Sequence, residues 1–154
     1  MAFHPDALVT RQVATNATTR TNEEETGALW RSSAAKYEQR RWAEQTEKAL
    51  YQDAAFKRYQ ASIEKALSKF ESVAVWADFI SFLTRLLKAL QSTTQFHAIP
   101  NKLVVAKRLS QCLNPALPSG VHTRALEVYT MIFTTIGVDG LRRDLQVWTP
   151  GLVP

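Results

Sequence analysis

The chain has 154 residues, of which 45% are hydrophobic and 21% are charged, so it can form one domain with a core and is not wholly disordered. Its net charge is +5, and the excess is uneven: residues 1–54 hold 7 basic and 8 acidic side chains, and residues 55–154 hold 12 and 6. A single cysteine excludes an internal disulfide and a zinc site built from several thiolates.

The first part of the chain carries little apolar pattern. Residues 1–27 are rich in Thr, Asn, Ala and Glu, and we expect a disordered tail there. Residues 28–54 favour helix, but with few large apolar side chains we expect a loosely packed helix or a linker. No apolar run reaches the roughly 18 residues of a membrane span, and no secretory signal is apparent.

A helical domain is predicted over residues 55–154. Apolar side chains recur at 3- and 4-residue spacing in five stretches, near 55–70, 76–90, 100–113, 121–136 and 141–148. Ser72 and Ser119 could cap the second and fourth helices, and Gly137 could close the fourth in a left-handed conformation. The predicted core positions are Trp76, Phe79, Ile80, Leu83, Leu87, Val128, Tyr129 and Ile132.

The arrangement of these helices follows from their short links. No segment alternates like a strand, so we predict an all-α fold in which consecutive helices form antiparallel hairpins. The two hairpins begin near Ala55 and Asn101, a separation that suits repeats of about 40–47 residues. We therefore expect a fragment of a HEAT- or armadillo-like α-solenoid.

Candidate sites are limited to basic side chains. His4, His97 and His122 lack the spacing of a metal site, and Cys112 lies on an apolar stripe, where it should pack as a small hydrophobe. We expect no metal, no cofactor and no catalytic activity. Basic residues occur on every predicted helix, Arg85 and Lys88 among them, and most could simply solvate polar faces. Those selected as candidate contacts for an anionic lipid or an acidic partner are Arg58, Lys65, Lys69, Lys107, Arg108 and Arg124.

Several strings resemble those of a known family. They include Tyr59-x-x-Ser62-Ile63-Glu64-Lys65-Ala66-Leu67, Trp76-Ala77-Asp78-x-Ile80 and Lys107-Arg108-Leu109-x-Gln111-Cys112-Leu113-x-Pro115-Ala116-Leu117-Pro118-Ser119-Gly120. In order and spacing, residues 57–154 resemble the N-terminal domain of the Dopey family. Dopey proteins continue far beyond the final Gly151-Leu152 string, so we expect a fragment, a truncated gene product or a divergent gene model.

The resemblance implies a non-enzymatic scaffold of membrane traffic between endosomes and the Golgi. It implies a cytoplasmic protein, peripheral at Golgi and endosome membranes, that works with an Arf-exchange-factor-like scaffold and an aminophospholipid flippase. It further implies a link to phosphatidylinositol 4-phosphate and to kinesin-dependent transport. The alternative is a basic helical domain that binds nucleic acid, which only the charge supports, because no nucleic-acid-binding signature is present.

Overall fold

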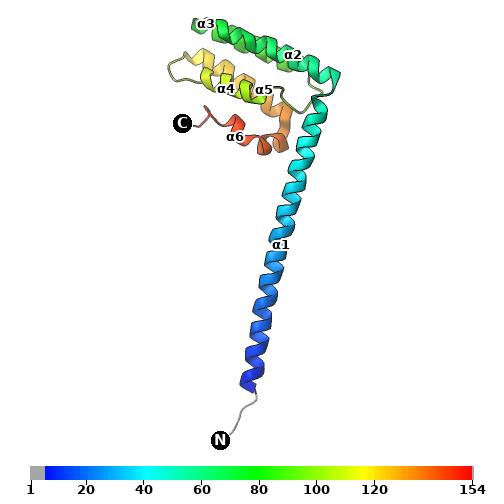
Figure 1. Ribbon diagram of the computed structural model, residues 1–154. Helices are drawn as coiled ribbons and strands as arrows, with labels where there is room; N and C mark the ends of the chain where they lie inside the picture. Colours follow the sequence, from blue (N-terminus) through cyan, green and yellow to red (C-terminus); the bar gives the residue numbers. More distant parts are fainter. Residues whose placement is uncertain (1–5, 154) are drawn as a thin grey trace. The chain divides into compact units, whose positions relative to one another are not determined.

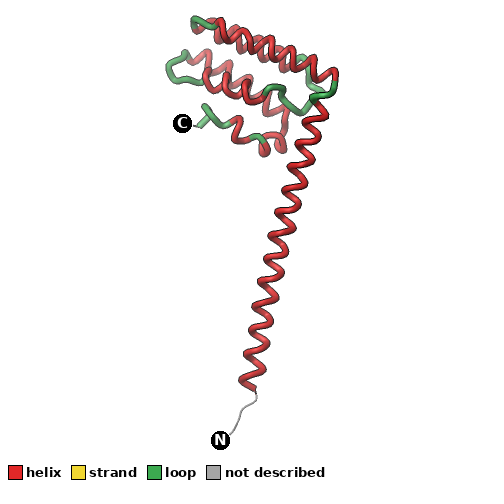
Figure 2. Tube along the Cα trace, in the orientation of Figure 1, coloured by secondary structure: helices red, strands yellow, loops and turns green. Residues whose placement is uncertain are grey.

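The computed structural model describes the backbone of residues 6–153 and, from Glu25 onward, the side chains other than that of Trp30. Helix dominates, and Figure 2 shows no strand in this range; Pro150 and Val153 form only an isolated bridge. The all-α prediction is confirmed. The chain divides into two units, residues 1–48 and 49–154.

Helix α1, Asp6–Leu50, makes up the described part of the first unit, and its last two residues, Ala49 and Leu50, are counted in the second unit. Its backbone is helical through residues 6–27, where the composition predicts a tail. A helix satisfies its backbone hydrogen bonds within itself, so it can form where the sequence has no apolar period. The described side chains agree with this, since Tyr37 and Trp42 are exposed. The division into tail, linker and domain stays a prediction.

The second unit contains the remaining helices (Figure 1). The chain first forms α2 (Ala54–Ser68), a 3-10 turn η1 (Lys69–Ser72) and α3 (Trp76–Gln91). It continues with α4 (Lys102–Cys112), α5 (Ser119–Arg143) and α6 (Leu145–Trp148). Helix α3 packs on both α2 and α5, and α4 packs on α5 and α6. Figure 1 shows the α2–α3 pair lying as a layer over the α4–α5 pair. Continued stacking as a solenoid stays a prediction.

Carboxylates start the first two helices of this unit. Asp53 accepts hydrogen bonds from the backbone N–H groups of Ala55 and Phe56, at 2.7 and 2.9 Å. Asp78 accepts from two backbone N–H groups just before α3, both at 3.0 Å. The expected cap Ser72 is wrong, because its hydroxyl donates to the carbonyl of Lys69 instead. Asp53 satisfies donors that the first turn of α2 leaves unpaired, whereas Asp78 reaches back from the first turn of α3 to the residues before it. Both contacts fix where the helix begins.

Helix α5 begins one residue earlier than expected and contains a break. Pro118 is its N-cap residue, so Ser119 is already helical and does not cap it. Gly137 has the expected positive φ, at 67°, but its ψ of −175° is extended. Only glycine adopts this combination readily. Helical structure then resumes as far as Arg143 and redirects the end of the chain.

The core lies where α3 crosses α2 and α5. The predicted residues Leu83, Val128, Tyr129 and Ile132 are buried, as expected, and Phe79, Ile80 and Leu87 are half-buried. Trp76 is the exception, with 57% of its surface exposed.

The exposure of Trp76 has a geometric cause. Gly120, at the start of α5, lies opposite Ile80, with the side-chain Cδ1 of Ile80 3.9 Å from a Cβ built on the glycine. Trp76 lies one turn before Ile80, beyond the point where α5 begins, so no part of α5 covers it.

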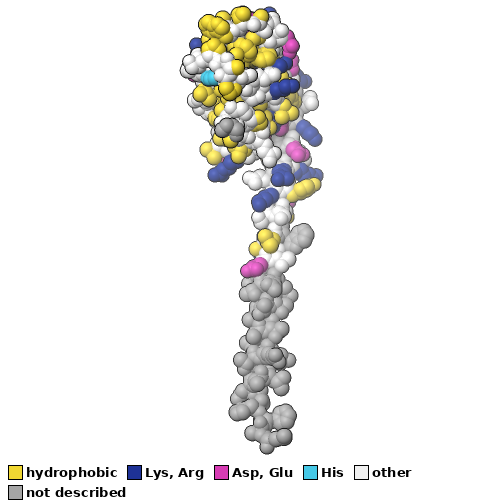
Figure 3. Space-filling view, turned by 90° about the vertical axis from the view of Figure 1, so that its left-hand side faces the viewer, with side chains coloured by type: hydrophobic (Ala, Val, Ile, Leu, Met, Phe, Trp, Pro, Cys, Tyr) yellow, Lys and Arg dark blue, Asp and Glu magenta, His cyan; other side chains and the backbone are white. Residues whose placement is uncertain are grey.

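Hydrophobic side chains gather on the face of this unit that Figure 3 shows.

The chain end is anchored at two points. Trp148 of α6 is buried, with 1% of its surface exposed. Asp144, which lies between α5 and α6, forms ion pairs with Lys102 of α4 at 3.1 Å and with its neighbour Arg143 at 3.2 Å. These anchors hold the segment after Gly137 against α4.

Candidate functional site

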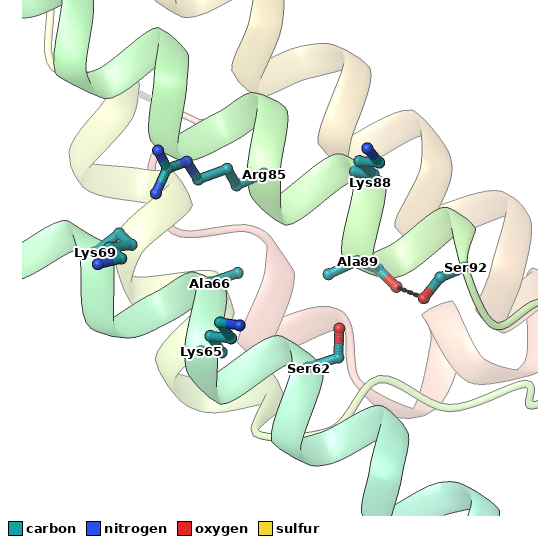
Figure 4. A pocket seen from close by; sticks show the side chains of 8 residues that line it. All are labelled: Ser62, Lys65, Ala66, Lys69, Arg85, Lys88, Ala89 and Ser92. Carbon is teal, nitrogen blue, oxygen red and sulfur yellow. Dashed lines mark hydrogen bonds between the residues drawn. The ribbon is translucent and has the colours of Figure 1, made fainter.

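A groove of about 360 Å³ runs between α2 and α3 (Figure 4). Each side of the groove supplies four lining side chains. On one side these are Ser62, Lys65 and Ala66 of α2 and Lys69 at the start of η1, and on the other side they are Arg85, Lys88 and Ala89 of α3 and Ser92 directly after it. Each wall thus carries two cations, and Ala66 and Ala89 line the space between the walls.

The same spacing produces both walls. On each side the lining residues stand at i, i+3, i+4 and i+7, which are neighbouring positions on the face of a helix and its continuation. The helices run in opposite directions, so Ala66 lies across from Ala89 (Figure 4). Figure 4 also shows that Lys69 and Arg85 lie on opposite walls at the same end of the groove. The small alanine side chains leave space between the rows, and the longer cations border it.

The cations of the groove are not neutralised within the part of the chain that the structure describes. Lys65, Lys69, Arg85 and Lys88 are all exposed, none of them forms an ion pair there, and no carboxylate lines the groove. Four like charges around one hollow attract an anion and leave the empty groove electrostatically unfavourable.

The nearest acidic residues along α2 and η1 are engaged elsewhere. Glu64 accepts hydrogen bonds from Asn101 and Gln60, each at 3.0 Å, and these bonds lower the pKa of its carboxyl, Asn101 contributing most. Glu71 pairs with Arg108 at 2.6 Å. Both carboxylates therefore serve contacts outside the groove.

A second hollow, of about 410 Å³, continues the groove at its serine end. It shares Ser62 and Ser92 with the first and adds Arg58, a fifth cation, together with the polar residues Thr93 and Thr94. Tyr59 also lines it, but this side chain is almost fully buried, and burial raises the pKa of its phenol to about 12.

The structure brings together three of the six sequence-predicted contact residues. Arg58, Lys65 and Lys69 line these connected hollows. Lys107 is exposed on α4 and lines neither of them. An anionic ligand for any of these residues stays a prediction.

The other two predicted residues are already paired. The guanidinium of Arg108 pairs with Glu71 and lies 4.5 Å from the centre of the Phe70 ring, so it joins α4 to η1. Arg124 pairs with Glu127 at 2.7 Å on the same helix. Arg85 and Lys88 line the groove although they were not among the six predicted contact residues. The i, i+3, i+4, i+7 pattern that both walls share is the sequence signal that could have identified them.

The remaining reactive side chains serve packing. Cys112 is buried, and burial raises the pKa of its thiol to about 12, so it is not a nucleophile at neutral pH. His122 has its Nε2 2.8 Å from the carbonyl oxygen of Asn114, so it forms a hydrogen bond at the proline-rich corner. Among the residues that the structure describes, no three His, Cys, Asp or Glu side chains cluster as a metal site. No helix in that same range is long and apolar enough to span a bilayer.

Comparison with known proteins bears on the second unit. The family described as "Dopey, N-terminal" matches residues 53–154. The chain belongs to the Dopey family. The resemblance seen over residues 57–154 is thereby confirmed, and both walls of the groove lie within the Dopey match.

Three Dopey relatives illustrate the similarity. Protein dop1 of Emericella nidulans is 53% identical over 110 residues, which cover 70% of this chain and 6% of that protein. Protein DOP1B of Mus musculus is 49% identical over 108 residues, 70% of this chain and 5% of its own length. Protein DOP1 of Saccharomyces cerevisiae is 45% identical over 107 residues, 66% of this chain and 6% of its own length. The chain thus spans only a small part of these Dopey proteins, and no solved structure matches it.

Proposed function

We propose that this chain is a non-enzymatic docking domain of a Dopey scaffold that acts in membrane traffic between endosomes and the Golgi. Family membership supports the scaffold role. The observation that carries the docking role is the groove between α2 and α3, where two exposed cations on each wall have no acidic partner in the described chain. Such a groove serves to hold an anionic group.

The partners of this scaffold follow from the family resemblance. They are an Arf-exchange-factor-like scaffold, an aminophospholipid flippase and a membrane surface that carries phosphoinositides. The domain works in the cytoplasm, peripheral to Golgi and endosome membranes. Each exposed Lys or Arg near an anionic leaflet contributes about 1 kcal/mol, so the groove supports recruitment but not stable anchoring.

The groove suits these partners better than nucleic acid. Proteins that hold single strands place exposed aromatic rings among their basic side chains, so that bases can stack. The main groove is lined by no aromatic residue, and Tyr59 in its continuation is buried.

A chimera tests the proposal. Residues 53–154 replace the matching segment of the Emericella nidulans protein dop1, with the groove intact or with Lys65, Lys69, Arg85 and Lys88 changed to Gln. We expect the intact chimera to locate to Golgi and endosome membranes and to sustain the recycling of an endocytosed membrane protein. The groove variant should lose both.

The control removes charge outside the groove, from two cations against the four of the groove variant. Lys57→Gln and Lys107→Gln neutralise two exposed cations that line neither hollow, and this chimera should behave like the intact one. Full recycling by the groove variant would refute the docking role. Nuclear location, with crosslinking to RNA, would favour the nucleic-acid alternative.

A further inference from the structure

The two rows of cations have a spacing that specifies more than negative charge. We infer that the groove between α2 and α3 is the docking site for an acidic amphipathic helix of a protein partner, which lies along the two helices. The inference rests on the proposed function, which assigns the groove an anionic partner, and it names the chemical class of that partner.

The cations of each wall repeat at one helical turn. Lys65 of α2 and Lys69 at the start of η1 are four residues apart, and Arg85 and Lys88 are three residues apart on α3. One turn advances about 5.4 Å along a helix, and carboxylates at i and i+4 of a third helix repeat at nearly that interval. A helix laid along the groove can therefore present two carboxylates to each wall at the same time.

The space between the rows suits the apolar stripe of such a helix. Ala66 and Ala89 are 6% and 8% exposed, and their methyl groups face the hollow from opposite sides (Figure 4). A methyl-lined floor accepts small apolar side chains and lets a helix approach closely. Apolar contact in the middle with charge on both flanks is the usual pattern when a helix binds in a groove.

A phosphate headgroup fits this lining less well. A compact phosphate is best held by donors that converge on it, whereas these cations form two separate rows along the groove. The floor between the rows offers methyl groups in place of donors. At the serine end, the hydroxyl of Ser92 already donates to the carbonyl of Ala89, at 2.7 Å. A ligand that carries several anions in a line can reach all four cations.

A designed peptide tests the inference on the full 154-residue chain. The probe is a fluorescein-labelled peptide of about 18 residues, with alanine along one face and Glu pairs at i, i+4 on both flanks. A scrambled peptide of the same composition, with the Glu spacing destroyed, is the first control. Vesicles of phosphatidylcholine with 5% phosphatidylinositol 4-phosphate, in the same buffer, are the second.

We expect fluorescence anisotropy to show binding of the patterned peptide and at least about 5-fold weaker binding of the scrambled one. Lys65→Gln combined with Lys88→Gln removes one cation from each wall, and it should weaken binding about 10-fold. Lys57→Gln combined with Lys107→Gln removes the same charge outside the groove and should change binding less than 2-fold. Circular dichroism should show the same helix content in all variants.

Position in the groove has an independent readout. Ser62→Cys, carrying a photoactivatable crosslinker, should capture the patterned peptide, because Cys112 is buried and does not compete for the label. A label at Lys107→Cys should not capture it.

Three results would overturn the inference. The first is equal binding of the two peptides, and the second is no binding of either. The third is vesicle binding that Lys65→Gln combined with Lys88→Gln abolishes, while neither peptide competes with the vesicles. Each of them leaves the chimera experiment intact, so a trafficking defect of the groove variant would still support docking of another anion. A chimera without a defect, together with specific peptide binding, would instead refute the proposed function alone.

Discussion

Replacing Leu83 with alanine measures the packing that holds the second unit together. Leu83 has 0% of its surface exposed and lies in α3, the helix that packs on both α2 and α5. Leu→Ala changes at fully buried sites remove the transfer free energy of the side chain and leave a cavity, at a cost of about 3–5 kcal/mol. For a unit of this size, 3 kcal/mol corresponds to a drop in Tm of roughly 12–24 °C.

The matched control is Leu103→Ala. Leu103 lies on α4 with 68% of its surface exposed, so the same chemical change should alter stability by less than about 0.5 kcal/mol. Urea titrations and thermal melts, followed by circular dichroism at 222 nm, give both values. If Leu83→Ala and Leu103→Ala differ by less than 1 kcal/mol, the burial of α3 described above is wrong.

Three further predictions concern other parts of the chain. The hydrogen bonds that Asp78 accepts from the backbone of Ala74 and Val75 lower the pKa of its carboxyl. This cap therefore stabilises the fold above the usual carboxyl pKa, and its contribution is lost as the pH falls through the lowered pKa. Asp78→Asn should flatten the acid side of the pH–Tm profile. The Cys112 thiol, with a pKa raised to about 12, should react with Ellman's reagent at pH 8 only as fast as the protein opens, and a burst of labelling would contradict its burial. Deletion of residues 1–27 should leave the Tm of the second unit unchanged, and a drop of many degrees would show that the segment is structural.

The helices of the second unit were predictable because each carries an apolar face that the core requires. The spacing around Leu83 and Ile132 located α3 and α5, and both residues are buried. Helix starts were less predictable, since serine and aspartate both cap helices and the choice depends on where the chain turns. At α3 the turn places Asp78 at the unpaired N–H groups, and Ser72 remains within the preceding turn.

The groove was half predictable for a different reason. Spacing within one helix placed Lys65 and Lys69 on the same face, but which side chains lie opposite depends on how α2 meets α3. Arg108 shows the same limit, because its partner Glu71 is 37 residues away along the chain and on another element. Contacts between elements decide which cations are neutralised, and helical periodicity carries no information about them.

The break at Gly137 also defines how the native protein opens. Beyond it, the chain is held by a few discrete anchors, among them the buried indole of Trp148 and the pair between Asp144 and Lys102. Segments held in this way exchange their amide hydrogens through local opening, at a lower free energy than the central helices. Residues 138–153 should therefore behave as one cooperative unit in native-state hydrogen exchange, distinct from the slower amides of α3 and the first part of α5. The glycine is thus a boundary between a durable core and a segment that can detach and re-form without global unfolding.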